Sequence, residues 1–358
     1  MTNVQPETAM VIGASGQDGY FLTRSLLAEG KLVHAIIRRP EAFAEIAALS
    51  TSATTLNVHL IDVAEPARLV ELIAETQPEE VYNLAGQSSV ARSFSEPRLT
   101  WLTNAEFVSV MLEAIRLHSP RSRFYQASST EMFGAGGSEI VYSEESPLNP
   151  QSPYANAKAA AHSLCRSYRE AYNLRIACGI LANHESRRRG KHFLTRKIVD
   201  HVAAIRTARA SRPPLKVGNL KIRRDWGFAP DYVEGIKLVL RQVATRAARG
   251  FEARSQDDEG HAYCDYTLST GRTHAVWELI DAAFAVGGYA LDWQLEGADA
   301  VSWQARFRAD GELAVQVDPQ LLRLADPLEI RVDSSRARRE LGWSPRTGLD
   351  VFLRDMFS

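Results

Sequence analysis

The 358-residue sequence contains little cysteine: Cys165, Cys178 and Cys264 are widely spaced and form no CxxC pattern. This sparse set argues against a disulfide scaffold or a thiolate metal site, so we expect no metal and assign the cysteines to packing. No apolar run is long enough to cross a bilayer, and residues 1–8 lack the basic-then-apolar pattern of a signal peptide. We therefore expect a cytoplasmic protein with no membrane partner.

An excess of charge of one sign is also missing. The chain has 42 Lys and Arg against 43 Asp and Glu, a formal net charge of -1. Such a balance gives no overall attraction to nucleic acid, so we expect no nucleic-acid partner, and an anionic ligand would need a local basic patch. The 45% hydrophobic and 24% charged composition is typical of a globular protein and excludes overall disorder.

Short apolar runs alternate with helical patterns over the first half of the chain. Strands are expected at residues 9–12, 33–37, 58–61, 80–84, 123–127 and 176–181, and helices at 67–76, 99–118 and 154–172. This alternation predicts an α/β fold with a doubly wound parallel Rossmann sheet.

The pattern changes after residue 183, where arginine, glycine breaks, Pro213-Pro214 and a polar insertion at 252–261 appear. We predict a nucleotide-binding Rossmann domain at 1–182 and a smaller mixed α/β substrate-binding domain in 183–358. Residues 225–245 and 264–269 are expected to return to the Rossmann domain.

A glycine-rich turn follows the first expected strand and opens a helix. Its residues are Gly13, Ser15, Gly16, Gln17, Asp18 and Gly19 around Ala14, with GxxGxxG spacing. Glycines at these places let the backbone approach a pyrophosphate, whose charge the helix N-terminus stabilises. A plain tight turn is the alternative, but the position after an N-terminal strand favours a dinucleotide site.

Arg38 and Arg39 stand at the end of the second expected strand, where the two nicotinamide cofactors are distinguished. An acidic residue there would bind the ribose hydroxyl of NAD, whereas cations pair with the 2′-phosphate of NADP. The alternative is a solvated basic loop. We expect NADP, and we place Asp62, after the third strand, near its adenine.

Tyr154 and Lys158 are four residues apart and hence on one face of the expected helix. A lysine cation nearby stabilises a phenolate and lowers the tyrosine pKa from about 10, which would make Tyr154 a base for a sugar hydroxyl. Alone, this spacing is common on helix surfaces. Downstream of a dinucleotide turn, the catalytic interpretation is favoured.

Ser129 and Glu131 end the fifth expected strand, at the edge where open α/β sheets bind ligands. Two residues apart in extended backbone, their side chains would point the same way and could orient a substrate oxygen and move a second proton. The alternative is a turn with a helix cap.

The sequence resembles the extended short-chain dehydrogenases, and within them the GDP-mannose 4,6-dehydratase family. The likeness covers almost the whole chain and rests on Gly13 to Gly19, Val33 to Arg39, Tyr82-Asn83-Leu84, Gln87-Ser88, Gln126 to Gly134, Ser152-Pro153-Tyr154, Tyr168 to Tyr172, Asn183 to Ser186, Thr195 to Ile198, Gly218-Asn219-Leu220 and Arg224 to Gly227.

This resemblance implies a reaction in which Tyr154 takes the proton of the sugar 4-hydroxyl while hydride moves from C4 to NADP. Ser129, where the family usually has Thr, would bond the 4-oxygen. Glu131 would remove the C5 proton and assist loss of the 6-hydroxyl as water, before hydride returns to C6. With Lys158, these residues form the expected catalytic set.

The resemblance also adds residues to the expected cofactor site and implies a substrate site. To the cofactor site it adds Val63, Leu84, Ala85, Gln87, Tyr154, Lys158, Leu181, His184 and Arg189. For the GDP-sugar substrate it implies Ser88, Ser129, Glu131, Asn183, Lys197, Gly218, Asn219, Arg224, Arg323 and Asp326. Cations in this set suit a diphosphate, although Arg187 to Arg189 could instead be a solvated face.

Three departures from the family pattern leave alternatives open. Leu324 to Asp326 replace the usual Pro-Thr-Glu, which affects base or ribose recognition, and Pro40 to Phe43 replace an arm that joins subunits, so a homodimer is as plausible as a homotetramer. The 252–261 insertion, and Lys221 where Asp is common, admit a GDP-manno-heptose as substrate. An epimerase or 4-keto reductase of the same fold, and a non-enzymatic NADP sensor, are the remaining alternatives.

Overall fold

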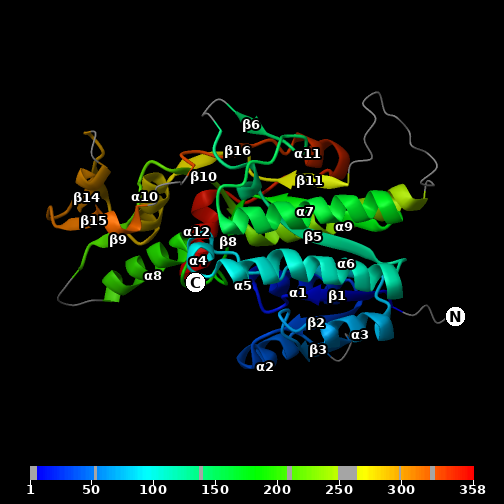
Figure 1. Ribbon diagram of the computed structural model, residues 1–358. Coiled ribbons are helices and arrows are strands. Elements are labelled where there is room, and N and C mark those ends of the chain that lie inside the picture. The colour runs from blue at the N-terminus through cyan, green and yellow to red at the C-terminus, as the bar shows by residue number, and fades with distance from the viewer. Residues whose placement is uncertain are drawn as a thin grey trace.

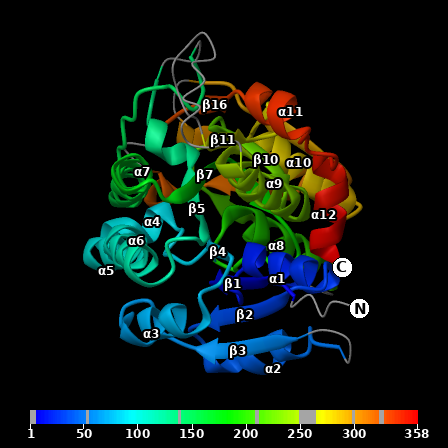
Figure 2. The same ribbon diagram turned by 90° about the vertical axis from the view of Figure 1, so that its right-hand side faces the viewer.

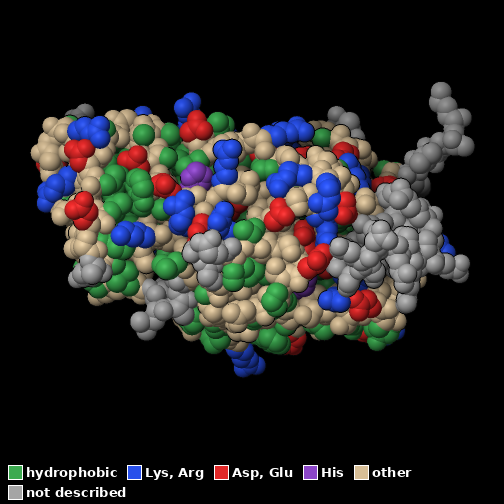
Figure 3. Space-filling view, turned by 90° about the horizontal axis from the view of Figure 1, so that it is seen from above, with side chains coloured by type: hydrophobic (Ala, Val, Ile, Leu, Met, Phe, Trp, Pro, Cys, Tyr) green, Lys and Arg blue, Asp and Glu red, His purple; other side chains and the backbone are tan. Residues whose placement is uncertain are grey.

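A seven-stranded sheet covered by helices on both faces, with a smaller lobe at one end, makes up this computed structural model (Figure 1). The structure describes residues 6–51, 55–136, 140–207, 212–248, 264–297, 300–322 and 327–358. Basic and acidic side chains are interspersed on the face shown in Figure 3.

All pairs of neighbouring strands in the large sheet are parallel, and the order is β11-β7-β5-β4-β1-β2-β3. The strands are β1 (Thr8–Ile12), β2 (Leu32–Ile37), β3 (Leu56–Leu60), β4 (Glu80–Asn83), β5 (Arg123–Ser129), β7 (Arg175–Leu181) and β11 (Asp265–Leu268). The doubly wound α/β prediction is therefore confirmed. The strand order reverses beside β1, which lies between β2 and β4, and ligands bind at such switch points.

The two faces of the sheet are buried by different helices (Figure 2). Met10 and Ile12 pack in one core cluster with α3 (Ala67–Thr76), α6 (Phe107–His118) and α7 (Pro153–Tyr172). Ala9 and Val11 pack in the opposite cluster with α1 (Gln17–Ala28) and α9 (Ala229–Ala248). Successive strand residues point to opposite faces, so strands covered on both sides are apolar throughout, which explains why these runs were recognisable.

The expected helix at 99–118 is interrupted. It consists of α5 (Pro97–Trp101), a π-helical turn η2 (Leu102–Glu106) and α6. Asn104 Nδ2 donates to the carbonyls of Gln87, at 3.1 Å, and Thr100, at 2.9 Å. The Asn104 side chain thus ties the π turn to the loop that contains Gln87, and π turns are frequent at functional sites.

The smaller lobe has its own hydrophobic core between helices and a mixed sheet. Its helices are α8 (Leu194–Thr207), α10 (Val276–Val286) and α12 (Leu349–Phe357), and its four-stranded sheet has the order β13 (Leu291–Gln294), β14 (Gln304–Phe307), β15 (Leu313–Val317), β9 (Leu215–Val217). A further sheet has three strands in the order β12 (Thr273–Ala275), β10 (Arg223–Phe228), β8 (Asn183–Glu185). Its strand β8 follows directly on the carboxyl end of β7.

The remaining elements are short. They are η1 (Pro40–Ala42), α2 (Phe43–Ala47), α4 (Val90–Ser95), η3 (Thr130–Phe133), η4 (Ala300–Ser302), η5 (Pro319–Leu321), α11 (Ser335–Leu341) and the pair β6 (Val141–Tyr142) with β16 (Arg331–Val332). Helix α9 packs on the large sheet and β11 pairs with β7. The domain boundary near residue 182 stays a prediction.

Among the helices of the described ranges, none has both the length and the apolar character that a membrane crossing requires. The three cysteines are buried and not disulfide-bonded. No cluster of His, Cys, Asp and Glu suited to a metal ion occurs within the described part of the chain.

Candidate active site

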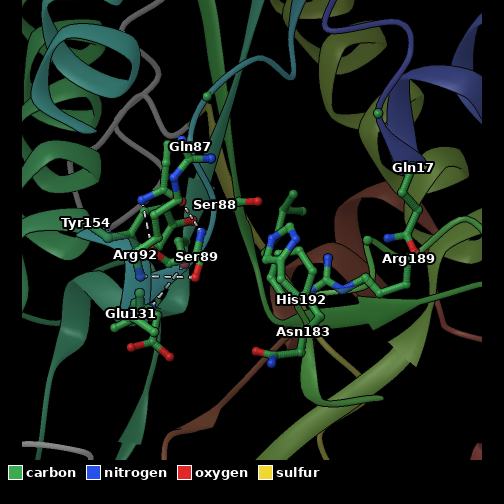
Figure 4. Close-up of a pocket in the computed structure, with 18 of the residues that line it drawn as sticks. Gln17, Gln87, Ser88, Ser89, Arg92, Glu131, Tyr154, Asn183, Arg189 and His192 are labelled. Carbon is green, nitrogen blue, oxygen red and sulfur yellow. Dashed lines mark hydrogen bonds between the residues drawn. The ribbon is translucent and has the colours of Figure 1, made fainter. Parts of the chain in front are cut away.

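A cavity of about 1130 Å³ lies at the carboxyl ends of β1, β4 and β5, between the large sheet and the smaller lobe (Figure 4). It brings together residues that the sequence separates widely. The predicted residues that line it are Gly13, Ser15, Gly16, Gln17, Asp18, Gly19, Arg38, Arg39, Val63, Leu84, Ala85, Gln87, Ser88, Ser129, Glu131, Tyr154, Lys158, Leu181, Asn183, His184, Arg189, Lys197, Gly218, Asn219 and Arg224.

The glycine turn is built for close backbone approach. Gly13 has φ +89°, and a Cβ there would lie 2.9 Å from the nitrogen of Ala85 on the neighbouring strand end. A Cβ on Gly19 would lie 2.2 Å from the Gly13 carbonyl oxygen, so α1 can pack against β1 only without a side chain there. Gly16 precedes α1 without a side-chain cap. A pyrophosphate at this uncapped N-terminus would accept hydrogen bonds from the backbone N–H groups, so the glycine turn fits a dinucleotide.

Side chains at the start of α1 join it to β8. Gln17 Nε2 donates to the carbonyl of His184 at 2.9 Å, and Ser186 Oγ donates to Gln17 Oε1 at 2.8 Å. His184 Nε2 lies 2.9 Å from Asp18 Oδ2. Burial opposes both charges, yet the pairing lowers the pKa of Asp18 and raises that of His184. Gln17, Asp18 and His184 thus line one side of the cavity while bonding to one another.

Arg38 and Arg39 follow β2 and reach the cavity from its outer end. The Arg39 side chain is 57% exposed, and its Nε lies 3.9 Å from Oε1 of the exposed Glu41. Asp62 does not line the cavity, and its Oδ1 accepts the backbone N–H of Ala64 at 3.0 Å in the turn after β3. Its place beside adenine stays a prediction.

Tyr154 and Lys158 lie one turn apart on α7, with Ser152 capping the helix by accepting the Ala155 N–H at 3.0 Å. Lys158 Nζ donates to the carbonyl of Ala127 at 3.0 Å and lies 6.0 Å from the Tyr154 ring centroid. Burial raises the pKa of Tyr154 to about 12, against the lowering effect of a Ser129 hydrogen bond, and lowers the pKa of Lys158 to about 8. The expected depression of the tyrosine pKa is wrong for the chain by itself, since burial dominates and the ammonium is bonded to backbone.

Ser129 and Glu131 both line the cavity, but not for the reason expected. Ser129 is the last residue of β5, whereas Glu131 lies in the 3₁₀ turn η3. Ser129 Oγ accepts a hydrogen bond from the Glu131 N–H at 3.3 Å. Ser129 therefore both caps the 3₁₀ turn and lines the cavity. The extended-backbone argument is wrong, because the chain turns immediately after Ser129. Glu131 Oε1 lies 3.6 Å from Arg224 Nε.

The smaller lobe supplies further polar groups. Arg224, from β10, also donates to the carbonyl of Pro327 at 2.8 Å. Asn219 Oδ1 accepts the N–H of Lys221, whose ammonium lies 4.0 Å from the Trp303 ring centroid rather than in the cavity lining. Lys197 reaches the lining from α8.

The run 187–189 is not a solvated face. Arg189 Nε lies 2.9 Å from Glu185 Oε2 with its guanidinium 3.6 Å from the Phe193 ring centroid. Arg188 pairs with Glu45 and stacks on Tyr20. The alternative interpretation of this charge run is wrong, because two of its side chains are mostly buried in contacts to other segments.

Several cavity residues have no counterpart in the sequence predictions. Ser89, Arg92 and His192 lie beside the predicted residues (Figure 4), and Trp226 and Lys216 line the lobe side. The Gln87-Ser88 string is the only signal that pointed near Ser89. Arg323, Asp326, the substituted segment 324–326 and the insertion at 252–261 lie outside the described residues.

A doubly wound parallel sheet, a glycine cradle at its switch point and a Tyr-Lys helix beside Ser129 define an enzyme of the extended short-chain dehydrogenase class with a nicotinamide cofactor. The model of the family described as GDP-mannose 4,6 dehydratase matches residues 10–356. The chain belongs to this family.

Curated relatives are similar in sequence to this chain over nearly its full length. The GDP-mannose 4,6-dehydratase of Sinorhizobium fredii (strain HH103) is 36% identical over 96% of this chain and 93% of that protein. GDP-mannose 4,6 dehydratase 2 of Caenorhabditis elegans is 36% identical over 98% and 88%. The Vibrio cholerae GDP-mannose 4,6-dehydratase is 35% identical over 98% and 92%.

Solved structures share the fold. The dTDP-glucose 4,6-dehydratase of Bacillus anthracis in complex with NAD has a TM-score of 0.74 at 16% identity, covering 98% of this chain and 95% of that one. The protein RMD of Pseudomonas aeruginosa, complexed with NADPH, has a TM-score of 0.70 at 22% identity, covering 98% and 97%. At these identities the likeness concerns the fold alone.

Proposed function

We propose that this protein converts GDP-mannose to GDP-4-keto-6-deoxymannose with loss of water, using NADP, as a homodimer or homotetramer in the cytoplasm. The observation that carries the proposal is the presence of Glu131 in one cavity with Ser129, Tyr154 and Lys158. A 4-keto reductase would not need a carboxylate for a C5 proton. Arg38 and Arg39 at the end of β2 support NADP over NAD.

The residues of the cavity would handle the protons of this reaction. Tyr154 Oη takes the proton of the sugar 4-hydroxyl, and Ser129 Oγ holds the same oxygen in place. A bound nicotinamide cofactor would supply the hydride acceptor and donor that the chemistry at C4 and C6 requires. Since burial raises the pKa of Tyr154 to about 12, a cation close to the phenol has to favour its ionised form during turnover.

Glu131 would carry the second proton transfer. Once C4 is a ketone, the C5 hydrogen is acidic, and the carboxylate removes it. Glu131 then gives that proton to the departing 6-hydroxyl, which leaves as water, so the side chain returns to its starting state. The neighbouring Arg224 cation, 3.6 Å away, stabilises the carboxylate before the transfer.

The lobe side would bind the nucleotide diphosphate. Lys197 and Arg224 reach the cavity from α8 and β10, and cations of this kind pair with phosphate oxygens. Gly218 allows close packing there, since a Cβ would lie 2.6 Å from the Leu321 carbonyl oxygen.

A mass-spectrometric assay tests the proposal directly. Purified protein is incubated with NADP and, separately, with GDP-mannose, a GDP-manno-heptose, UDP-glucose and dTDP-glucose, and each product is examined for loss of one water. Loss from GDP-mannose is the expected result. Loss from the heptose sugar alone would change the substrate assignment. A 4-keto product that has lost two hydrogens but no water, with NADPH formed, would change the reaction, and no conversion of any sugar would overturn the enzymatic proposal.

A further inference from the structure

Helix α7 carries a third polar residue on the face that holds Tyr154 and Lys158. His162 follows Lys158 by four residues, as Lys158 follows Tyr154, so the three side chains lie on one side of the helix. His162 is 8% exposed, and its Nδ1 lies 3.0 Å from Ser128 Oγ. Ser128 directly precedes Ser129. The helix of Tyr154 is thus joined through a buried side chain to the strand that ends in Ser129.

A buried ion pair lies on the other side of the imidazole. Asp265 Oδ2 is 3.7 Å from His162 Nε2, and Arg169 donates two hydrogen bonds to this carboxylate, at 2.8 and 3.0 Å. Asp265 Oδ1 also accepts the N–H of Cys178 at 3.2 Å. Since Asp265 is fixed by β7 and by the last turns of α7, the imidazole has a rigid support behind it.

Consecutive turns of α7 are therefore attached to consecutive residues of β5. Lys158 Nζ donates to the carbonyl of Ala127 at 3.0 Å, and His162 meets Ser128 one turn later. Hydrogen bonds are directional, whereas the alanines that make up much of this helix face pack without fixing a unique position. The two polar contacts therefore fix the position of α7 relative to β5 along the strand direction.

We propose that His162 is a positioning residue for the catalytic centre, holding α7 against β5 through Ser128 so that Tyr154 faces Ser129 across the substrate oxygen. His162 does not line the cavity and touches no reacting atom. The inference rests on the proposed dehydratase function, because the alignment matters through the proton transfer at Tyr154. Small misplacements of such groups cost up to about 100-fold in rate.

The test uses full-length protein and three substitutions. His162→Leu removes the polar contact at similar volume, His162→Asn keeps a hydrogen-bonding atom near the Nδ1 position, and Ser128→Ala removes only the hydroxyl. We expect His162→Leu and Ser128→Ala each to lower kcat by about 10- to 100-fold with KM changed less than about twofold, while His162→Asn restores most of kcat. The double variant His162→Leu with Ser128→Ala should lose no more than either single variant.

His201→Leu is the matched control, because His201 is a half-buried histidine of α8 that packs near Phe284 and does not line the cavity. Its kcat should stay at the wild-type value. Thermal unfolding and cofactor titration check that each variant is folded, and Ser128→Ala keeps the inference testable if His162→Leu does not fold. Wild-type kcat in folded His162→Leu and Ser128→Ala, or no rescue by Asn, overturns it.

The same assay separates this inference from the proposed function. If wild-type protein removes no water from any nucleotide sugar, the proposed function fails whatever the variants do. If wild-type protein is active and the variants are equally active, the proposed function stands and the positioning role of His162 falls.

Discussion

Glu131 and Arg224 meet across the cavity, with Oε1 of Glu131 3.6 Å from Nε of Arg224. Glu131 comes from the turn after the central strand β5, and Arg224 from β10 beside the smaller lobe. Their side chains are 18% and 11% exposed, so both charges are mostly shielded from solvent. Glu131, proposed to remove the C5 proton, is thereby paired with Arg224, proposed to bind the diphosphate. Substrate binding would therefore change the electrostatic environment of Glu131.

Glu131→Gln should separate the two halves of the reaction. Without the carboxylate, water loss should fall by about 100- to 10,000-fold, the usual contribution of a general base. Exchange of the C4 hydrogen with the cofactor should continue, because Tyr154 is untouched. Mass spectrometry with C4-deuterated GDP-mannose measures both. The control Glu106→Gln, at an exposed position, should behave as wild type, and unchanged water loss in Glu131→Gln would require another C5 base.

Tyr154→Phe should lower turnover by about 1000-fold or more while leaving cofactor affinity within a few-fold, because the phenyl ring keeps the packing and loses only the proton-transferring oxygen. Cofactor binding is followed by fluorescence titration and turnover by product formation. Tyr142→Phe, at a buried tyrosine outside the cavity lining, controls for loss of a hydroxyl. Near-normal turnover in Tyr154→Phe would remove this residue from the mechanism.

Replacing Arg38 and Arg39 together by Ala should weaken NADP binding by about 10- to 100-fold, since two cations near a 2′-phosphate each contribute charge-assisted bonds. NAD affinity should change little, because NAD lacks that phosphate. Calorimetric titration with both cofactors gives the ratio. Arg24→Ala, on the exposed side of α1, is the control, and equal losses for NADP and NAD would refute the assignment of these arginines.

Two glycines of the phosphate turn should respond differently to alanine. Gly19→Ala should lower the free energy of unfolding by about 1–3 kcal/mol, because its Cβ would lie 2.2 Å from the Gly13 oxygen and 2.7 Å from Ala14 Cα, forcing α1 away from β1. At Gly16 an added Cβ would lie 3.2 Å from the Gly13 carbonyl oxygen, so Gly16→Ala should keep stability and weaken only cofactor binding. Denaturant unfolding and cofactor titration distinguish the two, and equal stabilities would contradict the packing argument.

The His184–Asp18 pair should make stability depend on pH. The His184 pKa is raised in the folded state, so its contribution is complete below the unfolded pKa of about 6.5 and is lost as pH rises through the folded value. The Asp18 pKa is lowered, so its contribution is present above about 3.9 and is lost as pH falls through the folded value. The pair should stabilise most between about pH 4 and 6.5.

His184→Gln should therefore lower Tm more at pH 5.5 than at pH 8.5, measured without cofactor. His118→Gln, at an exposed position in the last turn of α6, provides the comparison for loss of a histidine. Equal losses of Tm at both pH values would show that the pair makes no charge-dependent contribution.

The sheet could be predicted because buried parallel strands are continuous apolar runs. The run 9–12 and the strand β1 agree to one residue, and helix 67–76 agrees at both ends. The turn at Glu131 could not be predicted, because it is held by residues far along the chain. The N–H of Asn149 donates to the carbonyl of Met132, and a Cβ on Gly134 would lie 1.9 Å from the Asn149 oxygen.

The sequence by itself determined the class of chemistry, because the glycine spacing after the first strand and the Tyr-Lys spacing are local patterns whose geometry follows from a strand-turn-helix and from the helix period. Only the tertiary structure decided the partners of these groups: Ala127 for Lys158, Arg224 for Glu131 and Ser128 for His162. Each partner lies on another segment of the chain. Such contacts depend on how helices and strands pack, and burial at those contacts sets the pKa values of Tyr154 and Lys158.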